Sequence, residues 1–151
     1  MNITANRTSL PLSKRRRYLL DDQVGFVLRQ AFQRHTTLFT EKMGAEITPT
    51  QWAVISKLHE IGACSQNLLG RQTAMDAATV KGVVDRLTKR GIVATEPDPN
   101  DGRRILVSLT EEGENLADLH IGRALDVTEA TLAPLTATER GTLMSLLMKL
   151  R

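Results

Sequence analysis

Residues 76–113 read DAATVKGVVDRLTKRGIVATEPDPNDGRRILVSLTEEG and indicate the fold class. In the first part, residues 76–91, apolar side chains recur every three or four positions, which is the period of a helix. In residues 104–109 apolar and polar side chains alternate, which is the period of a strand. Turn-forming residues fill 97–102 between them. The stretch therefore predicts a helix followed by a β-hairpin, with the tight turn at Asp101–Gly102.

Capping residues mark the starts of five helices along the chain. Thr48 is followed by a proline at the first helical position and by glutamine three residues after the cap, and Thr136 also begins a capping box. The helix that starts at Ser65 is expected to run to about Ala74, with Leu68 and Leu69 as its buried pair. The predicted caps are Thr48, Ser65, Asp76, Thr110 and Thr136.

An earlier helix is predicted to begin at Tyr18, with an apolar stripe that extends from Val24 to Phe39. The order is then four helices, a hairpin and two helices, which predicts a mainly α fold with a small β-hairpin wing. This is the order of a winged helix-turn-helix with helices before and after it. The apolar stripes of those N- and C-terminal helices exceed what one small winged domain could cover, so we expect them to be dimerisation helices. We divide the chain into a flexible basic tail (1–17), a helical dimerisation region (18–45 and 111–151) and a DNA-binding lobe (46–110).

Composition agrees with one domain of 151 residues, because 41% hydrophobic residues suffice for a core and only 3% are aromatic. The single cysteine, Cys64, excludes an internal disulfide and favours a reducing compartment. No apolar run approaches the roughly 20 residues that a membrane span needs. We therefore expect a cytoplasmic protein.

Charge is unevenly distributed along the chain. Residues 1–17 carry five basic groups and no acid, and residues 71–104 carry seven basic against five acidic groups. Residues 105–151, in contrast, carry four basic against seven acidic groups. Such asymmetry fits a molecule with one face for a polyanion, although a mild split of this kind also occurs on ordinary solvated surfaces.

The helix after Asp76 has the side chains that a DNA major groove accepts. Its outer face is small or polar over the first turns, so it can approach base edges, where Thr79 can contact a thymine and Lys81 a guanine. Basic residues toward its end suit phosphates. The alternative is an ordinary charged surface helix. The predicted contacts on this helix are Ala77, Ala78, Thr79, Lys81, Gly82, Asp85, Arg86, Lys89 and Arg90.

The hairpin supplies a second predicted contact with DNA. Arg103 and Arg104 lie at its tip and return strand, and a guanidinium on a narrow tip fits the minor groove. Asp98 or Asp101 is placed to hold one of these arginines by a paired hydrogen bond. Two arginines in a loop are by themselves a weak indication of DNA binding. Together with the preceding helix they form a specific one.

These residues resemble the MarR family of bacterial transcription regulators. The resemblance covers residues 48–113 and extends over the flanking helices, with a weaker similarity of residues 13–37 to the branch that regulates nicotinic acid degradation. Gly70 and Thr73 depart from the family pattern, which commonly has alanine and a larger apolar residue there. The motifs that carry the resemblance are ITPTQW (47–52), VKGVVDRLTKRG (80–91), DPNDGR (98–103) and VSLTEEG (107–113).

The resemblance implies a homodimer that binds a palindromic operator, usually as a repressor, and is released by a small aromatic acid. His35 lies on the first apolar stripe, Trp52 and His59 share a helix face, and Arg29 lies about a turn and a half before His35. An aromatic wall with polar neighbours suits a flat anionic effector, hydroxynicotinate-like for this branch. The ordinary alternative is that these residues only pack in the core.

Alternative functions would depend on other residues of the chain. A metal-responsive regulator would use His35, His59 and His120, whose spacing matches no ligand motif. A thiol-oxidation sensor would use Cys64, which has no second cysteine to resolve it. A helical protein-interaction module also remains open. The sequence offers no nucleophile–base pair, catalytic carboxylate pair or phosphate-binding loop, so we expect no enzyme and no cofactor.

Overall fold

The computed structural model describes residues 17–151, which form two units. The smaller unit extends to Gln33 and contains a 3₁₀ helix, η2 (Leu20–Asp22), and the first half of helix α1 (Val24–Met43). The α-helix therefore begins at Val24 and not at Tyr18, because the chain forms the separate η2 turn before it. The larger unit comprises Arg34–Arg151. The predicted tail, residues 1–17, lies outside the described residues except for Arg17.

Five helices of the larger unit begin where the sequence predicts. The capping side chains accept hydrogen bonds from backbone N–H groups of the first turn, and those of Thr48 and Thr136 form complete capping boxes. Local hydrogen bonds therefore fix these helix starts. The helices are α2 (Pro49–Ile61), α3 (Gln66–Gln72), α4 (Ala77–Lys89), α5 (Glu111–Leu132) and α6 (Ala137–Met148).

A three-stranded antiparallel sheet completes the lobe. Strands β2 (Val93–Asp98) and β3 (Asp101–Leu109) form the predicted hairpin, and the sheet order is β1-β3-β2. Strand β1 (Cys64–Ser65) was not predicted, because two residues carry no periodic signal. It pairs with β3 through Cys64 opposite Val107 and Ser65 opposite Leu106.

The prediction of a tight turn at Asp101–Gly102 is wrong. The turn is formed by Pro99 and Asn100, and Asp101 and Gly102 already belong to β3. A regular ladder from an Asp101–Gly102 turn would shift the pairing by one residue and place Val93 and Val107 on opposite faces. Both side chains lie in one core, so the observed ladder keeps the core register and absorbs the difference in an irregularity at Pro97/Asp98.

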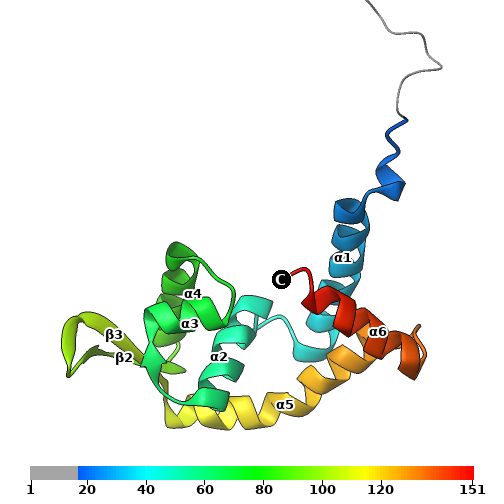
Figure 1. The fold of residues 1–151 in the computed structure, drawn as a ribbon. Coiled ribbons are helices and arrows are strands. Elements are labelled where there is room, and N and C mark those ends of the chain that lie inside the picture. Colours follow the sequence, from blue (N-terminus) through cyan, green and yellow to red (C-terminus); the bar gives the residue numbers. More distant parts are fainter. Residues whose placement is uncertain (1–16) are drawn as a thin grey trace, which may run out of the picture. The chain divides into compact units, whose positions relative to one another are not determined.

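One hydrophobic core holds α2, α3, α4 and the sheet together. The apolar stripe predicted for α4 is buried completely, with Val80, Val83, Val84 and Leu87 each at most 2% exposed. Leu69 is fully buried, whereas its predicted partner Leu68 is only partly buried. Figure 1 shows α3 and α4 packed next to each other, with the hairpin projecting beside them. The outer face of α4 is thus left to solvent.

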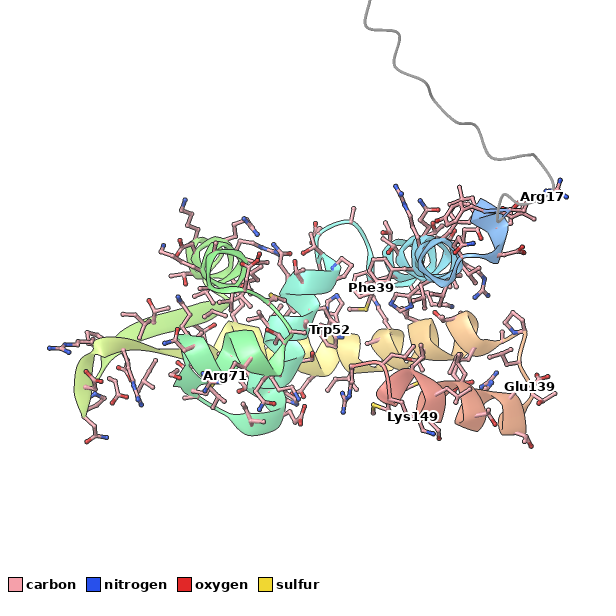
Figure 2. All side chains as sticks on the ribbon, turned by 45° about the horizontal axis from the view of Figure 1, so that its top comes forward. Arg17, Phe39, Trp52, Arg71, Glu139 and Lys149 are labelled. Carbon is pink, nitrogen blue, oxygen red and sulfur yellow. The ribbon has the colours of Figure 1, made fainter. Side chains whose placement is uncertain are left out.

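A second, smaller cluster joins α1 to α5 within the larger unit. It consists of Phe39, Met43 and Val127, with Trp52 and Ala124 packed against it. Trp52 also contacts the main core, so it links the two clusters, and Figure 2 shows it near Phe39. Among the described residues, no helix combines the length and apolar character that crossing a bilayer requires.

Candidate nucleic-acid interface

The first turn of α4 presents a small, exposed surface. The carboxylate of Asp76 accepts a hydrogen bond from the Thr79 backbone N–H at 2.7 Å. This hydrogen bond, together with one from the Thr79 side chain, lowers the pKa of Asp76. Ala77, Ala78 and Thr79 are all exposed. A backbone that is firmly capped and bears only small side chains can approach base edges closely.

The next turn carries an ion pair and a glycine covered by an arginine. Lys81 Nζ lies 2.6 Å from Asp85 Oδ2 on the exposed face. A Cβ on Gly82 would lie 3.4 Å from Nη1 of Arg86, so the Arg86 guanidinium rests over the glycine. The predicted contacts Lys81, Asp85 and Arg86 therefore share one solvent-facing surface of α4, and Asp85 holds Lys81 in place.

At the end of α4 the basic residues differ in their surroundings. Lys89 is exposed, as the prediction requires. Arg90, predicted as a phosphate contact, donates through Nη1 to the Glu46 carbonyl at 2.8 Å and to Gln51 Oε1 at 3.3 Å. Arg90 thus fastens the end of α4 to the start of α2, a role that no local pattern indicates.

The wing tip is shaped by its two aspartates. The Asp98 carboxylate accepts a hydrogen bond from the Asn100 N–H at 2.9 Å, and Asp101 accepts one from the Arg103 N–H at 3.1 Å. Arg104 Nε lies 3.6 Å from Asp101 Oδ2, so Asp101 is the aspartate beside an arginine. The Arg103 guanidinium is exposed and makes no ion pair with any residue of 17–151.

Polar residues at the start of α3, which the sequence does not mark as part of the interface, lie next to the hairpin. Ser65, Gln66 and Asn67 line a cavity of about 110 Å³ together with Arg103, Arg104 and Ile105. Pairing of β1 with β3 brings these two segments together across about 40 residues of sequence. The cavity can be recognised only when this strand pairing is known, and the sequence does not indicate the pairing.

Of the proposed effector residues, His35 is anchored to α5. Its Nδ1 lies 2.9 Å from the Thr131 hydroxyl, and that hydroxyl donates its own hydrogen to the Val127 carbonyl at 2.8 Å. Because that hydroxyl gives its hydrogen to Val127, it accepts the hydrogen bond from His35 Nδ1. Trp52 lies beside His120, with ring centroids 6.3 Å apart.

The other two residues predicted to bind the effector are His59 and Arg29. His59 faces acids of α5, with Nδ1 2.7 Å from Glu114 Oε2 and Nε2 3.5 Å from Asp118 Oδ1. Arg29 belongs to the smaller unit. Although Trp52 and His59 both lie on α2, the ring that approaches Trp52 is His120.

The alternative sensors find little support in the geometry. Within residues 17–151, no cluster of three or more histidine, cysteine or acidic residues is arranged to hold a metal ion. Cys64 is buried in β1, and burial raises the pKa of its thiol. Because the thiolate is the form that oxidises readily, this environment slows the reaction that a thiol sensor requires.

Comparisons with known proteins agree with this arrangement. The chain is 39% identical to the HTH-type transcriptional repressor NicR of Pseudomonas putida over 134 residues, covering 88% of this chain and 85% of NicR. A probable transcriptional regulator from Pseudomonas aeruginosa has a similar structure, with a TM-score of 0.85 and 51% identity, covering 88% of this chain and 100% of that one.

A third relative is Bordetella bronchiseptica BpsR, whose DNA binding is regulated by 6-hydroxynicotinic acid. It is 37% identical, with a TM-score of 0.85, and the match covers 89% of this chain and 96% of BpsR. The MarR family itself matches residues 47–105, which span the helix-turn-helix and most of the wing. The chain, with its capped outward-facing α4 and arginine-tipped hairpin, therefore belongs to the MarR family of DNA-binding transcription regulators and is not an enzyme.

Proposed function

We propose that this protein is a cytoplasmic repressor that binds a palindromic operator as a homodimer and leaves it when a small aromatic acid binds. The observation that carries the DNA-binding geometry is the outer face of α4. Every apolar residue of its stripe is buried, while the exposed first turn carries only alanine and threonine side chains. A helix whose apolar side is buried and whose other side carries small side chains can place that other side in a DNA groove.

The assignment of contacts follows from this geometry. Thr79 and Lys81 contact base edges in the major groove. Gly82 leaves room for the Arg86 guanidinium on the same surface. Arg86 and Lys89 contact phosphates, which set the register of the protein on the duplex. Arg103 enters the adjacent minor groove. Arg90 supports the interface indirectly, because its guanidinium holds α4 to α2.

Support for a homodimer comes from apolar side chains that the single chain leaves uncovered. On α5, Leu119 and Leu125 are 67% and 63% exposed, and no residue of α6 is buried. Exposed apolar area of this extent is typical of an interface between subunits. A twofold dimer would place two copies of α4 about one helical turn of DNA apart, which matches a palindromic site.

The effector proposal rests on the relatives and on His35. NicR and BpsR are similar over most of the chain, and 6-hydroxynicotinic acid regulates DNA binding by BpsR. We assign His35 and Trp52 to a pocket for a hydroxynicotinate-like acid. His59 is left out, because its ring nitrogens face two carboxylates that would repel an anionic ligand.

The test uses purified full-length protein and fluorescently labelled duplexes from its own upstream region. We expect specific binding by anisotropy, with an affinity that falls steeply as salt rises, because phosphate contacts release counterions. Added 6-hydroxynicotinate is expected to raise the melting temperature and release the duplex, whereas benzoate serves as a related acid without the pyridine ring. Failure to bind any upstream duplex at low salt would refute the DNA-binding geometry. Binding without release by any aromatic acid would refute only the effector.

A further inference from the structure

A small polar cavity lies between the start of α3 and the outer part of β3. Its volume is about 110 Å³. The residues that line it are one serine, one glutamine, one asparagine, two arginines and one isoleucine, and none of them is acidic. Amide and guanidinium N–H groups are hydrogen-bond donors, so the chemistry of the cavity favours an anion. Its lining residues are Ser65, Gln66, Asn67, Arg103, Arg104 and Ile105.

The cavity exists because β1 is short. Its partners on β3 are only Val107 and Leu106, whereas β3 continues outward to Asp101. The chain turns into α3 immediately after Ser65, so the outer edge of β3 on that side has no strand partner. The start of α3 and the outer edge of β3 thus diverge and leave a donor-lined space between them.

We propose that this cavity holds one phosphate of the DNA backbone, with Gln66, Asn67 and Arg104 as donors. The inference rests on the proposed function. With α4 in a major groove and the hairpin tip in the neighbouring minor groove, the sugar–phosphate strand that separates the two grooves must pass between them. Figure 1 shows α3 beside α4 and next to the hairpin, which is where that strand would run.

Arg104 is suited to change partner when DNA binds. Its side chain is 61% exposed, and its one ion-pair partner within residues 17–151 is Asp101 at 3.6 Å. Such an exposed, long pair contributes little, so a phosphate can replace it at small cost. The contact would be independent of base sequence, because it reaches only the backbone.

The test compares Asn67→Ala and the double variant Gln66→Ala/Asn67→Ala with Asn115→Ala, which removes an exposed amide on α5. Affinities are measured by anisotropy for an operator duplex and for a scrambled duplex. We expect the α3 variants to lose about three- to tenfold affinity for both duplexes equally, because hydrogen bonds to a charged group are lost. Asn115→Ala should bind as the wild type does, and Asn67→Asp should lose more than Asn67→Ala through repulsion.

A neutral methylphosphonate, placed one position at a time along the operator backbone, identifies the phosphate. At one position it should weaken the wild type but leave the double variant unaffected, since the contact is already absent. Unchanged affinity of every α3 variant while the wild type binds the operator would overturn the cavity proposal and leave the proposed function intact. Stabilisation by inorganic phosphate without any effect on DNA affinity would mark a free-anion site and also overturn it. A wild type that binds no duplex would overturn both.

Discussion

Arg103 carries an exposed guanidinium at the wing tip that is available to bind DNA. Its backbone is fixed by Asp101, while its exposed guanidinium makes no ion pair with the described residues. We expect Arg103→Ala to weaken operator binding about tenfold or more, since a guanidinium in the minor groove is lost, and to leave the dimer intact. Anisotropy titrations measure this, with Arg123→Ala on α5 as the matched control. An unchanged operator affinity would remove the wing from the interface.

Lys81 has a different expected signature, because it is assigned to a base rather than to a phosphate. Its ammonium is held by Asp85 at 2.6 Å on the exposed face of α4. Lys81→Ala should cost about 1–3 kcal/mol for the operator and much less for a scrambled duplex, since only the operator presents the matching base edge. Lys89→Ala, assigned to a phosphate, is the comparison and should weaken both duplexes alike. Equal losses for Lys81→Ala would show that it contacts only the backbone.

At the scale of the elements, the turn between α3 and α4 contains a backbone conformation unfavourable to its residue. Ala74 has φ +54°, and the Met75 N–H donates to the Gly70 carbonyl at 2.9 Å, which is a Schellman ending. The same ending at α4 uses Gly91, with φ +74°. We expect Ala74→Gly to stabilise the protein by about 0.5–1 kcal/mol in denaturant unfolding. Gly91→Ala should do the reverse, and a less stable Ala74→Gly protein would refute the argument.

The junction of the wing with α5 depends on a glycine. A Cβ at Gly113 would overlap the carbonyl oxygen of Ile92, which accepts the Thr110 N–H at 3.1 Å. Gly113→Ala should therefore destabilise the protein by about 1–3 kcal/mol in denaturant unfolding. Gly122→Ala, in the same helix with no atom near its added methyl group, should instead stabilise by about 0.5–1 kcal/mol. Equal effects of the two substitutions would mean that the junction relaxes freely.

At the scale of the whole molecule, the proposed dimer determines whether two copies of α4 reach one operator. Leu146 on α6 is 53% exposed in the single chain. A charge there would be buried at the proposed interface, so Leu146→Glu should yield monomers of about the 16.7 kDa chain mass and lose operator affinity. Light scattering after size exclusion measures the mass, and Ser145→Glu controls for the added charge. A Leu146→Glu protein that remains dimeric would exclude this face from the interface.

Much of the architecture was predictable because its causes are local. The starts of α2, α3, α4, α5 and α6 depend on a side chain that bonds to backbone three residues later, and a sequence displays that relation directly. The buried stripe of α4 followed from helical period in the same way. The candidate DNA contacts were found as a consequence, since they are the remaining face of that helix and the tip of the hairpin.

Local sequence patterns thus specify the succession of the α-helices and the hairpin, the helix caps, and the division of α4 into a core face and an outer face. The hairpin register, the pairing of β1 with β3, and the partners of Arg90 and His59 become visible only in the folded chain. These depend on residues distant in the chain that meet through a shared core, and burying Val93 and Val107 together outweighed the local turn preference of Asp101–Gly102.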